Sequence, residues 1–548
     1  MSSSQRSQFS LRGARDKNLL ISGRTPVPTH RHAAPSGPWP WMDFDADDST
    51  ATLSTSEEVE SSWRNYPQNK FKNWTPEQVK RSKMLTNCSV GTCKVFRVDV
   101  LDDGRFDDDR TREVTSVAPD EVDELWDKII VPRPSNVRAR AVFVDNMNEE
   151  VLKILGTKYV IEPFFFSSSM NWIPSRYQEA VETGKGDHIT IILPFIRPIH
   201  NHGSRWSGIF PPTSMVSYTS FSADQQDIDT QAPLLLHSSK CTLIQDLLAI
   251  HMIRGTKTST LISYHPNMRT SAQRLHSLIQ RTGRSVYWSK IFEKSKDPTF
   301  LFLTFLWYAL YAWDESLELL YKHITWLEAQ VLHTSDIHLT RELHILQAHL
   351  LHYKLLLEDF RKSVQFVLDT TNPAMRATDV KEHERELSAK LLRIEVRNLL
   401  DEIKRLDGQR KLQSDRLQNV MDLAFASVNI DDSRYMKRLS EATLRDSAAM
   451  KQIAYLTMVF FPASFMAGVF GMNVREFVGQ PGVDYPATLP RYAAVTLSLT
   501  CIVSWVLIAL QAHSSFHPPG CSRLRKWGWP VFYVWERFLR PKKGVKFA

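Results

Sequence analysis

The stretch Ile453–Phe470 reads IAYLTMVFFPASFMAGVF and contains no charged residue. A second uncharged stretch, Tyr492–Ala512, reads YAAVTLSLTCIVSWVLIALQA. A bilayer core about 30 Å thick needs about 20 apolar residues in a helix that crosses it, and both stretches come close to that length. The sequence therefore predicts two C-terminal transmembrane helices, which we assign to residues 453–473 and 491–513.

The charges around these segments predict their orientation. Four cations shortly precede the first segment, and eight follow the second in the tail 514–548, opposed there only by Glu536. The connecting loop 474–490 has a single cation, beside Glu476 and Asp484. Because Lys and Arg favour the cytosolic side, we expect both termini in the cytosol and a short external loop. A basic tail could also bind nucleic acid, but its place beside a span favours membrane retention, and no nucleic-acid partner is expected.

Averaged over its whole length, the chain has the composition of a soluble protein. Its 548 residues are 43% hydrophobic and 23% charged, with a mean hydropathy of −0.29 and a net charge of +8. Five cysteines without a CxxC spacing indicate a reducing compartment. The sequence contains no phosphate-binding GxxxxGK[ST] motif, which argues against an ATP-driven pump. It also offers no nucleophile and base arrangement or cofactor loop, so neither an enzyme nor a cofactor is expected.

Upstream of the membrane segments, the patterns change three times. Residues 1–84 are assigned to a disordered N-terminal region, since the first 60 are rich in Ser, Pro and Arg; a mitochondrial transit peptide is the alternative. Residues 85–265 mix strand and helix patterns and predict a cytosolic α/β layered domain. Helices are expected over 121–130 and 149–155, and strands over Val95–Val100, Ala139–Val144, Ile189–Ile196, Ala232–Leu236 and Thr260–Tyr264.

Residues 266–370 predict a cytosolic helical layer. Its uncharged run Thr299–Trp313, TFLFLTFLWYALYAW, is too short to cross a bilayer comfortably and is interpreted as a buried core helix. Residues 371–452 predict long, charged stalk helices. A weak coiled-coil seam with four-three spacing runs through Leu417, Met421, Ala424, Val428, Asp431, Tyr435, Leu439, Ala442, Asp446, Ala449 and Ile453. The fold class is thus an α+β/α cytosolic domain with a long stalk helix, plus two C-terminal transmembrane α-helices.

The triplet Gly471-Met472-Asn473 ends the first membrane segment. The run from Met450-Lys451-Gln452 through Pro462 to Phe465-Met466-Ala467-Gly468-Val469-Phe470 and this triplet resembles the CorA family of magnesium and other divalent-cation transporters, whose ZntB branch transports zinc. The resemblance implies a funnel-shaped homopentamer in which the first spans line the pore and the second spans form an outer ring. It also implies that Gly471, Met472 and Asn473 form the selectivity filter at the external mouth.

The chain departs from the family pattern at two points. Phe470 stands where the family usually has Tyr before the triplet, and the loop lacks the acidic Met-Pro-Glu-Leu element of many members. Glu476 and Asp484 are the candidates to supply negative potential in its place. These changes leave the expected position of the filter as it is.

A stripe along the first membrane segment is the candidate pore lining. Counted inward from the filter, spacings of three to five place its members near one helix face: Gly468, Ser464, Phe461, Thr457, Ile453, Met450 and, on the cytosolic side, Asp446. Hydroxyls of the stripe could bind hydration waters, and its apolar end could form a gate. The alternatives are a face that packs on the second span and, for Asp446, a solvated stalk acid.

The chemistry of the triplet suggests its cargo. Mg²⁺ is satisfied by oxygen ligands and loses its waters reluctantly, so a ring of Asn473 amides could contact the hydrated ion, while Gly471 lets the chain leave the helix. Magnesium flux driven by the membrane potential is therefore the leading hypothesis. A zinc or other transition-metal transporter and a membrane-anchored, non-conducting scaffold are the alternatives. The plasma membrane is the first expected location and the mitochondrial inner membrane the second.

Overall fold

The structure is a computed structural model of the whole chain. The residues that it describes are 34–37, 62–107, 115–117, 122–130, 133–200, 228–266, 271–333, 337–471, 488–510 and 527–528. The chain divides into two compact units, Met1–Ser427 and Val428–Ala548. Each unit is described by itself.

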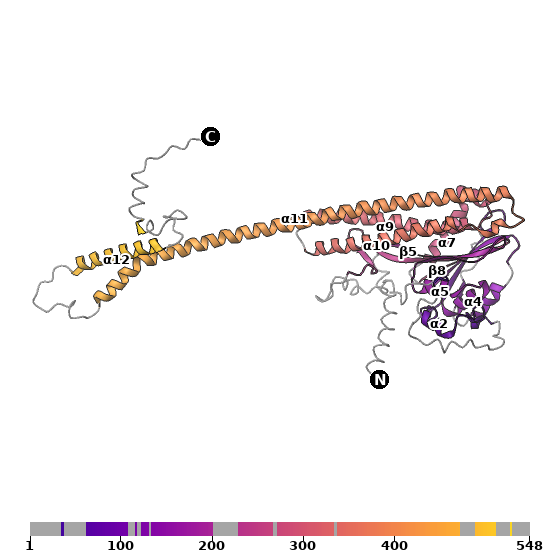
Figure 1. The fold of residues 1–548 in the computed structure, drawn as a ribbon, viewed down its shortest axis with the longest axis horizontal. Coiled ribbons are helices and arrows are strands. Elements are labelled where there is room, and N and C mark those ends of the chain that lie inside the picture. The colour runs from indigo at the N-terminus through magenta and orange to yellow at the C-terminus, as the bar shows by residue number, and fades with distance from the viewer. Residues whose placement is uncertain are drawn as a thin grey trace, which may run out of the picture. The chain divides into compact units, whose positions relative to one another are not determined.

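The first unit is built on a mixed sheet of eight strands (Figure 1). Its strand order is β2-β1-β3-β8-β7-β5-β4, and β6 also pairs with β7. β3 and β8 run parallel, and the other pairs are antiparallel. The strands are β1 (Cys93–Leu101), β2 (Thr115–Val117), β3 (Val137–Asp145), β4 (Ser175–Glu182), β5 (Gly186–His200), β6 (Leu234–Leu236), β7 (Cys241–Gly255) and β8 (Ser259–His265). The five strands expected from the sequence are all present, although β6 is shorter than the predicted Ala232–Leu236.

The two longest strands, β5 and β7, form an antiparallel pair that lies between β8 and β4. Their register runs from Gly186 opposite Gly255 to His200 opposite Cys241. β7 was not predicted because its sequence, CTLIQDLLAIHMIRG, is a nearly continuous apolar run. Both of its faces are covered, so the period-two alternation that marks a half-exposed strand is missing.

Long helices cover one face of the sheet (Figure 1). They are α7 (Ser271–Arg284), α8 (Val286–Lys294), α9 (Thr299–His333), α10 (Ile337–Asp369) and the first part of α11 (Glu382–Gly471), and a 3-10 turn, η4 (Pro373–Arg376), precedes α11. Residues Phe300 to Leu306 of α9 are all buried in this core. The interpretation of Thr299–Trp313 as a core helix is therefore confirmed.

Shorter helices cover the opposite face. They are η2 (Trp63–Asn65), α2 (Pro76–Ser82), α3 (Val122–Ile130), α4 (Glu149–Tyr159) and α5 (Pro163–Met170). The prediction of disorder up to residue 84 is wrong for residues 62–84, because Trp63, Tyr66 and Trp74 bury their rings in this second core. The Tyr66 hydroxyl donates a hydrogen bond to the carbonyl oxygen of Ile161 at 2.6 Å. Scattered aromatic residues anchor a segment whose average composition is polar.

The long stalk helix expected from the sequence is present as one continuous helix, α11, of 90 residues. Within the first unit, its seam residues Leu417, Met421 and Ala424 are buried against α9 and α10. In the second unit, the same seam is open, with Tyr435 66% and Leu439 49% exposed. The second unit also contains α12 (Thr488–Leu510), at the position of the second predicted span.

Candidate functional site

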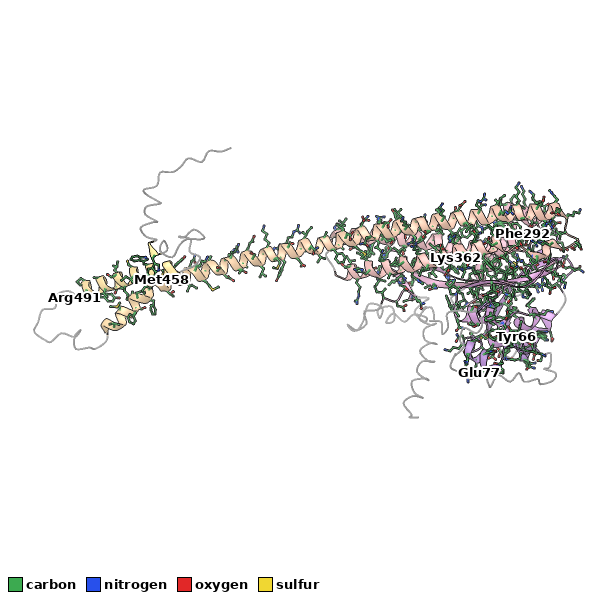
Figure 2. All side chains as sticks on the ribbon, viewed as in Figure 1. Tyr66, Glu77, Phe292, Lys362, Met458 and Arg491 are labelled. Atoms are coloured by element: carbon green, nitrogen blue, oxygen red, sulfur yellow. The ribbon has the colours of Figure 1, made fainter. Side chains whose placement is uncertain are left out.

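The end of α11 and the helix α12 contact each other within the second unit. The hydroxyl of Tyr492 on α12 donates a hydrogen bond to the carbonyl oxygen of Ala463 on α11 at 3.1 Å. The bond lies next to Pro462, which lacks an N–H and therefore leaves the carbonyl of Met458 without its helical partner. Figure 2 labels Met458 on α11 and Arg491 near the start of α12. Pro462 thus lies where the two helices pair.

Two opposite stripes of α11 differ in their surroundings. The side that faces α12 carries the partly or fully buried residues Met458, Pro462, Ala463, Met466 and Val469. The predicted pore stripe lies on the other side: at about 100° per residue, its six members fall within an arc of about 80°. All six are exposed, and Met450, Ile453 and Phe461 are 68%, 61% and 70% exposed. In the single chain, the stripe therefore does not pack on α12.

Two hydroxyls of this stripe are held by their own helix. Ser464 Oγ donates to the carbonyl oxygen of Phe460 at 2.8 Å, and Thr457 Oγ1 donates to that of Ala454 at 3.0 Å. Because the hydroxyl hydrogen is used in this way, the oxygen lone pairs remain available as acceptors. A hydrated cation directs its water hydrogens outward, so acceptors are the groups that such an ion needs.

The triplet Gly471-Met472-Asn473, which the sequence predicts to be the filter, is described only at its first residue. Gly471 is exposed at the end of α11, and no heavy atom lies within 4 Å of the position that a Cβ would take. Met472, Asn473, Glu476 and Asp484 lie outside the described residues. Asp446 is exposed on the same side of α11 as the stripe. Gly468 is equally unobstructed, with no atom within 4 Å of a Cβ there.

Among the described residues, one helix is long and apolar enough to cross a membrane. It is α11, whose best 18-residue window has a mean hydropathy of 1.4 and is only 12% buried. α12 forms where the second span was predicted. Large apolar side chains on α12, such as Leu497 at 67% and Ile502 at 55%, are exposed.

Elsewhere, among the described residues of the first unit, there are two clusters of side chains that could hold a metal ion. One consists of Glu179, His188 and His251, and the other of His237, His323 and Glu342. Sequence analysis missed both because their members lie far apart in the chain with no ligand spacing. Only strand register and helix packing bring them together.

Fold and exposure together define a class of protein. A mixed-sheet domain with a helical layer continues into one very long helix, and the end of that helix is apolar and exposed. Such a chain is a membrane protein with a large water-soluble part. Residues 237–511, just over half of the chain, match the family model described as CorA-like Mg2+ transporter protein. The chain belongs to this family of divalent-cation transporters, which is not a family of enzymes.

Other similarities are more distant or more local. The notoamide biosynthesis cluster protein M' of Aspergillus versicolor is 34% identical over 113 residues, which are 19% of this chain and 23% of that protein. The complete CorA magnesium transporter of Methanocaldococcus jannaschii is 14% identical, with a TM-score of 0.37 over 77% of this chain and 98% of that one. The full-length CmaX protein is 11% identical, with a TM-score of 0.35 over 76% of this chain and 97% of that one. The cytoplasmic domain of ZntB from Vibrio parahaemolyticus is 9% identical, with a TM-score of 0.30 over 61% of this chain and 99% of that one.

Proposed function

We propose that this protein is a CorA-type channel that carries Mg²⁺ passively through a pore lined by α11. The observation that carries the proposal is the exposure of the stripe from Met450 to Gly468 on the side of α11 away from α12. A face that is apolar and hydroxyl-bearing, and that its own chain leaves uncovered, is suited to line a shared pore. α12 would then stand outside α11 and face lipid.

The proposed assembly is a homopentamer, as the family resemblance implies. Two features support an assembly of several copies. The seam of α11 beyond Val428 carries exposed apolar residues such as Tyr435 and Leu439, and the membrane segment exposes Phe460 and Phe465. Exposed apolar surface of this extent is typical of interfaces or of lipid contact. Five α11 helices would place five copies of each stripe residue around one axis.

The proposed filter is Gly471-Met472-Asn473 at the external end of α11. Mg²⁺ keeps its waters and is well served by neutral oxygen ligands, so rings of Asn473 amides would contact the hydrated ion. Ser464 and Thr457 would accept hydrogen bonds from its waters deeper in the pore, and Met450 with Ile453 would form an apolar gate. External Glu476 and Asp484 would attract cations to the mouth, and Asp446 would do so at the inner end.

The proposed topology has two spans and both termini in the cytosol. The sheet domain, the helical layer and the stalk would all be cytosolic, with the loop 474–490 outside and a basic cytosolic tail at 514–548. The membrane potential supplies about 2.3 kcal/mol per charge per 100 mV, which is about 4.6 kcal/mol for a divalent ion and sufficient for uptake. The plasma membrane is the proposed location, with the mitochondrial inner membrane as the second candidate.

Ion flux into liposomes tests the function. Purified full-length protein is reconstituted, and Mg²⁺ entry is followed with an internal dye, with Zn²⁺ and Co²⁺ as competitors. We expect saturable Mg²⁺ entry that is lost in Asn473→Ala. Zn²⁺ entry without Mg²⁺ entry would assign the chain to zinc transport, and no flux from a correctly assembled oligomer would favour a scaffold.

Thiol labelling tests the pore stripe separately. In a cysteine-free background, Ser464→Cys places a thiol on the stripe, and Met466→Cys places one on the side that faces α12. A water-soluble cationic thiol reagent is expected to modify the first and reduce flux, and to leave the second unmodified. Equal reaction at both positions, or reaction at 466 alone, would refute the assignment of this face to the pore.

A further inference from the structure

Three side chains of the first unit whose chemistry allows them to bind a metal ion share one face of its sheet. Glu179 on β4 is paired with His188 on β5, and His251 on β7 is paired with Thr190, two residues along β5. Paired residues, and residues two apart in a strand, point to the same face. This face is the one covered by α5, since the ring centroid of Phe165 lies 5.3 Å from that of His251.

The three side chains converge. Their candidate ligand atoms all lie within 4.8 Å of one another, and His188 Nδ1 is 3.8 Å from Glu179 Oε1. The His188 and His251 rings meet edge to face with centroids 5.3 Å apart. His251 is wholly buried, whereas His188 and Glu179 remain 18% and 13% exposed. The cluster is therefore nearly enclosed, but two of its members reach solvent.

Two buried polar atoms of the cluster have no hydrogen-bond partner among the described residues: His251 Nε2 and Glu179 Oε2. The other ring nitrogen of His251, Nδ1, lies 2.8 Å from Thr190 Oγ1. When Nδ1 donates this hydrogen bond, the lone pair of Nε2 is free. Metal-binding histidines are typically oriented by such a second hydrogen bond. Because burial of a polar atom without a partner is unfavourable, both atoms point to a role in binding a ligand.

We propose that Glu179, His188 and His251 form a binding site for a divalent transition-metal ion, with Zn²⁺ as the best match. Two imidazole nitrogens and one carboxylate are a donor set typical of zinc, completed by water or a second carboxylate. Metal–ligand bonds of about 2.0–2.2 Å require ligand atoms roughly 3–4 Å apart, and the 3.8 Å between His188 and Glu179 fits this range. Mg²⁺ prefers oxygen ligands, so imidazole nitrogens disfavour it.

A second carboxylate, that of Glu162 at the start of α5, interacts electrostatically with Glu179. Both carboxylates are partly buried, so they repel each other when charged, and a bound cation would relieve that repulsion. The substitution Glu179→Gln keeps the size and shape of the side chain and is expected to fold, while it removes the anionic ligand.

The second cluster is satisfied without a metal. His237 Nδ1 and His323 Nε2 lie 2.9 and 3.0 Å from the same Glu342 oxygen, so these atoms already have partners. His237 is also about half exposed. The assay below uses a His237→Gln background so that this cluster cannot contribute zinc.

The proposed site goes beyond the proposed channel and does not depend on it. Its ligands join the edge strand β4 to β5 and β7 within the first unit, and the site would bind metal whether or not the chain conducts. Bound zinc would cross-link three strands and stabilise this half of the sheet.

The test measures metal on the full-length protein in detergent, in the His237→Gln background. The protein is incubated with Zn²⁺, desalted and analysed by mass spectrometry of the metal, and a parallel sample with Co²⁺ is examined by visible absorption. The variants are Glu179→Gln and His188→Gln. Glu182→Gln is the matched control, because it lies on the same strand and its carboxylate is exposed beside Lys185.

We expect one retained zinc ion per chain, insensitive to millimolar Mg²⁺, with Co²⁺ absorption typical of four-coordinate nitrogen and oxygen ligands. Affinity should fall at least about tenfold in Glu179→Gln and His188→Gln and stay unchanged in Glu182→Gln. Circular dichroism establishes that each variant is folded. The proposal is overturned if the background protein retains no zinc, or if folded Glu179→Gln and His188→Gln retain as much as it does. Loss of Mg²⁺ flux in the Asn473→Ala variant with zinc binding intact separates this site from the channel.

Discussion

Arg254 on β7 and Asp187 on β5 form an ion pair in which both side chains are completely buried. Arg254 Nε donates to Asp187 Oδ1 at 2.6 Å, and its Nη1 donates to Thr299 Oγ1 at 3.2 Å and to the carbonyl oxygen of Thr370 at 3.1 Å. One guanidinium thus joins the sheet to the start of α9 and to the residue after α10. These hydrogen bonds connect the helical layer to the sheet.

The substitution Asp187→Asn is expected to destabilise the first unit by about 3–5 kcal/mol, because it leaves the buried Arg254 charge without its partner. Hydrogen exchange of the β5 and β7 amides in the full-length protein measures the loss. The control is Asp123→Asn, which removes an exposed ion pair with Arg64 and should cost less than about 1 kcal/mol. Equal protection in both variants would contradict this role of the buried pair.

Tyr492→Phe should weaken the contact between α11 and α12 without changing the shape of the side chain. It removes the hydrogen bond to the carbonyl oxygen of Ala463, which in membrane helices is worth about 0.5–1.7 kcal/mol. Thermal unfolding in detergent, followed by tryptophan fluorescence, reports the effect, since Trp505 lies on α12. No shift relative to Ser498→Ala, whose hydroxyl bonds only within α12, would contradict it.

The helix α4 leaves no space for a side chain at Gly156. A Cβ there would lie 2.4 Å from Tyr66 Cζ, so Gly156→Ala should displace the Tyr66 ring and cost about 1–3 kcal/mol. Limited proteolysis should then cut within residues 62–84. Gly408→Ala is the opposite case, because nothing lies within 4 Å of its Cβ position in α11; it should stabilise the helix by up to about 1 kcal/mol. Similar proteolysis of the two variants would argue against anchoring by Tyr66.

Stability should fall in acid, in part through His265. Burial lowers the pKa of this imidazole to about 4 from an ordinary value of 6.5, so between these pH values the unfolded chain binds a proton that the folded chain does not. The contribution of His265 is therefore complete above pH 6.5 and is lost as the pH falls towards 4, by about 3 kcal/mol in total. Asp145, whose pKa burial raises to about 6, acts in the opposite direction over a similar range.

The variant His265→Asn isolates this contribution. Unfolding temperatures of the full-length protein and of the variant are compared from pH 7.5 to 4.5. The protein with His265 should lose stability more steeply below pH 6.5, and the difference between the two should shrink as the pH falls. Parallel curves would mean that His265 is not the group that titrates.

Local patterns in the sequence were sufficient for several elements. The uncharged stretch Ile453–Phe470 predicted the apolar end of α11, and family membership agrees with the resemblance seen around Gly471-Met472-Asn473. Alternation predicted β1 and β3, and the length of Thr299–Trp313 predicted a core helix. Each of these signals is a local pattern, such as the spacing of apolar residues or the length of an uncharged run. Such a pattern can be recognised in the sequence without knowledge of the tertiary structure.

The remaining features depended on contacts between distant parts of the chain. β7 is a strand because β5 and β8 pair with it on either side, although its apolar run could also be a helix. Tyr66 is ordered because Gly156 gives its ring room. Glu179, His188 and His251 meet only through strand register, which moves every side chain to the other face when it slips by one residue. The sequence alone predicted a pore helix, but its stripe could face either α12 or a shared axis, and packing within the second unit leaves that stripe exposed because α12 covers the opposite side.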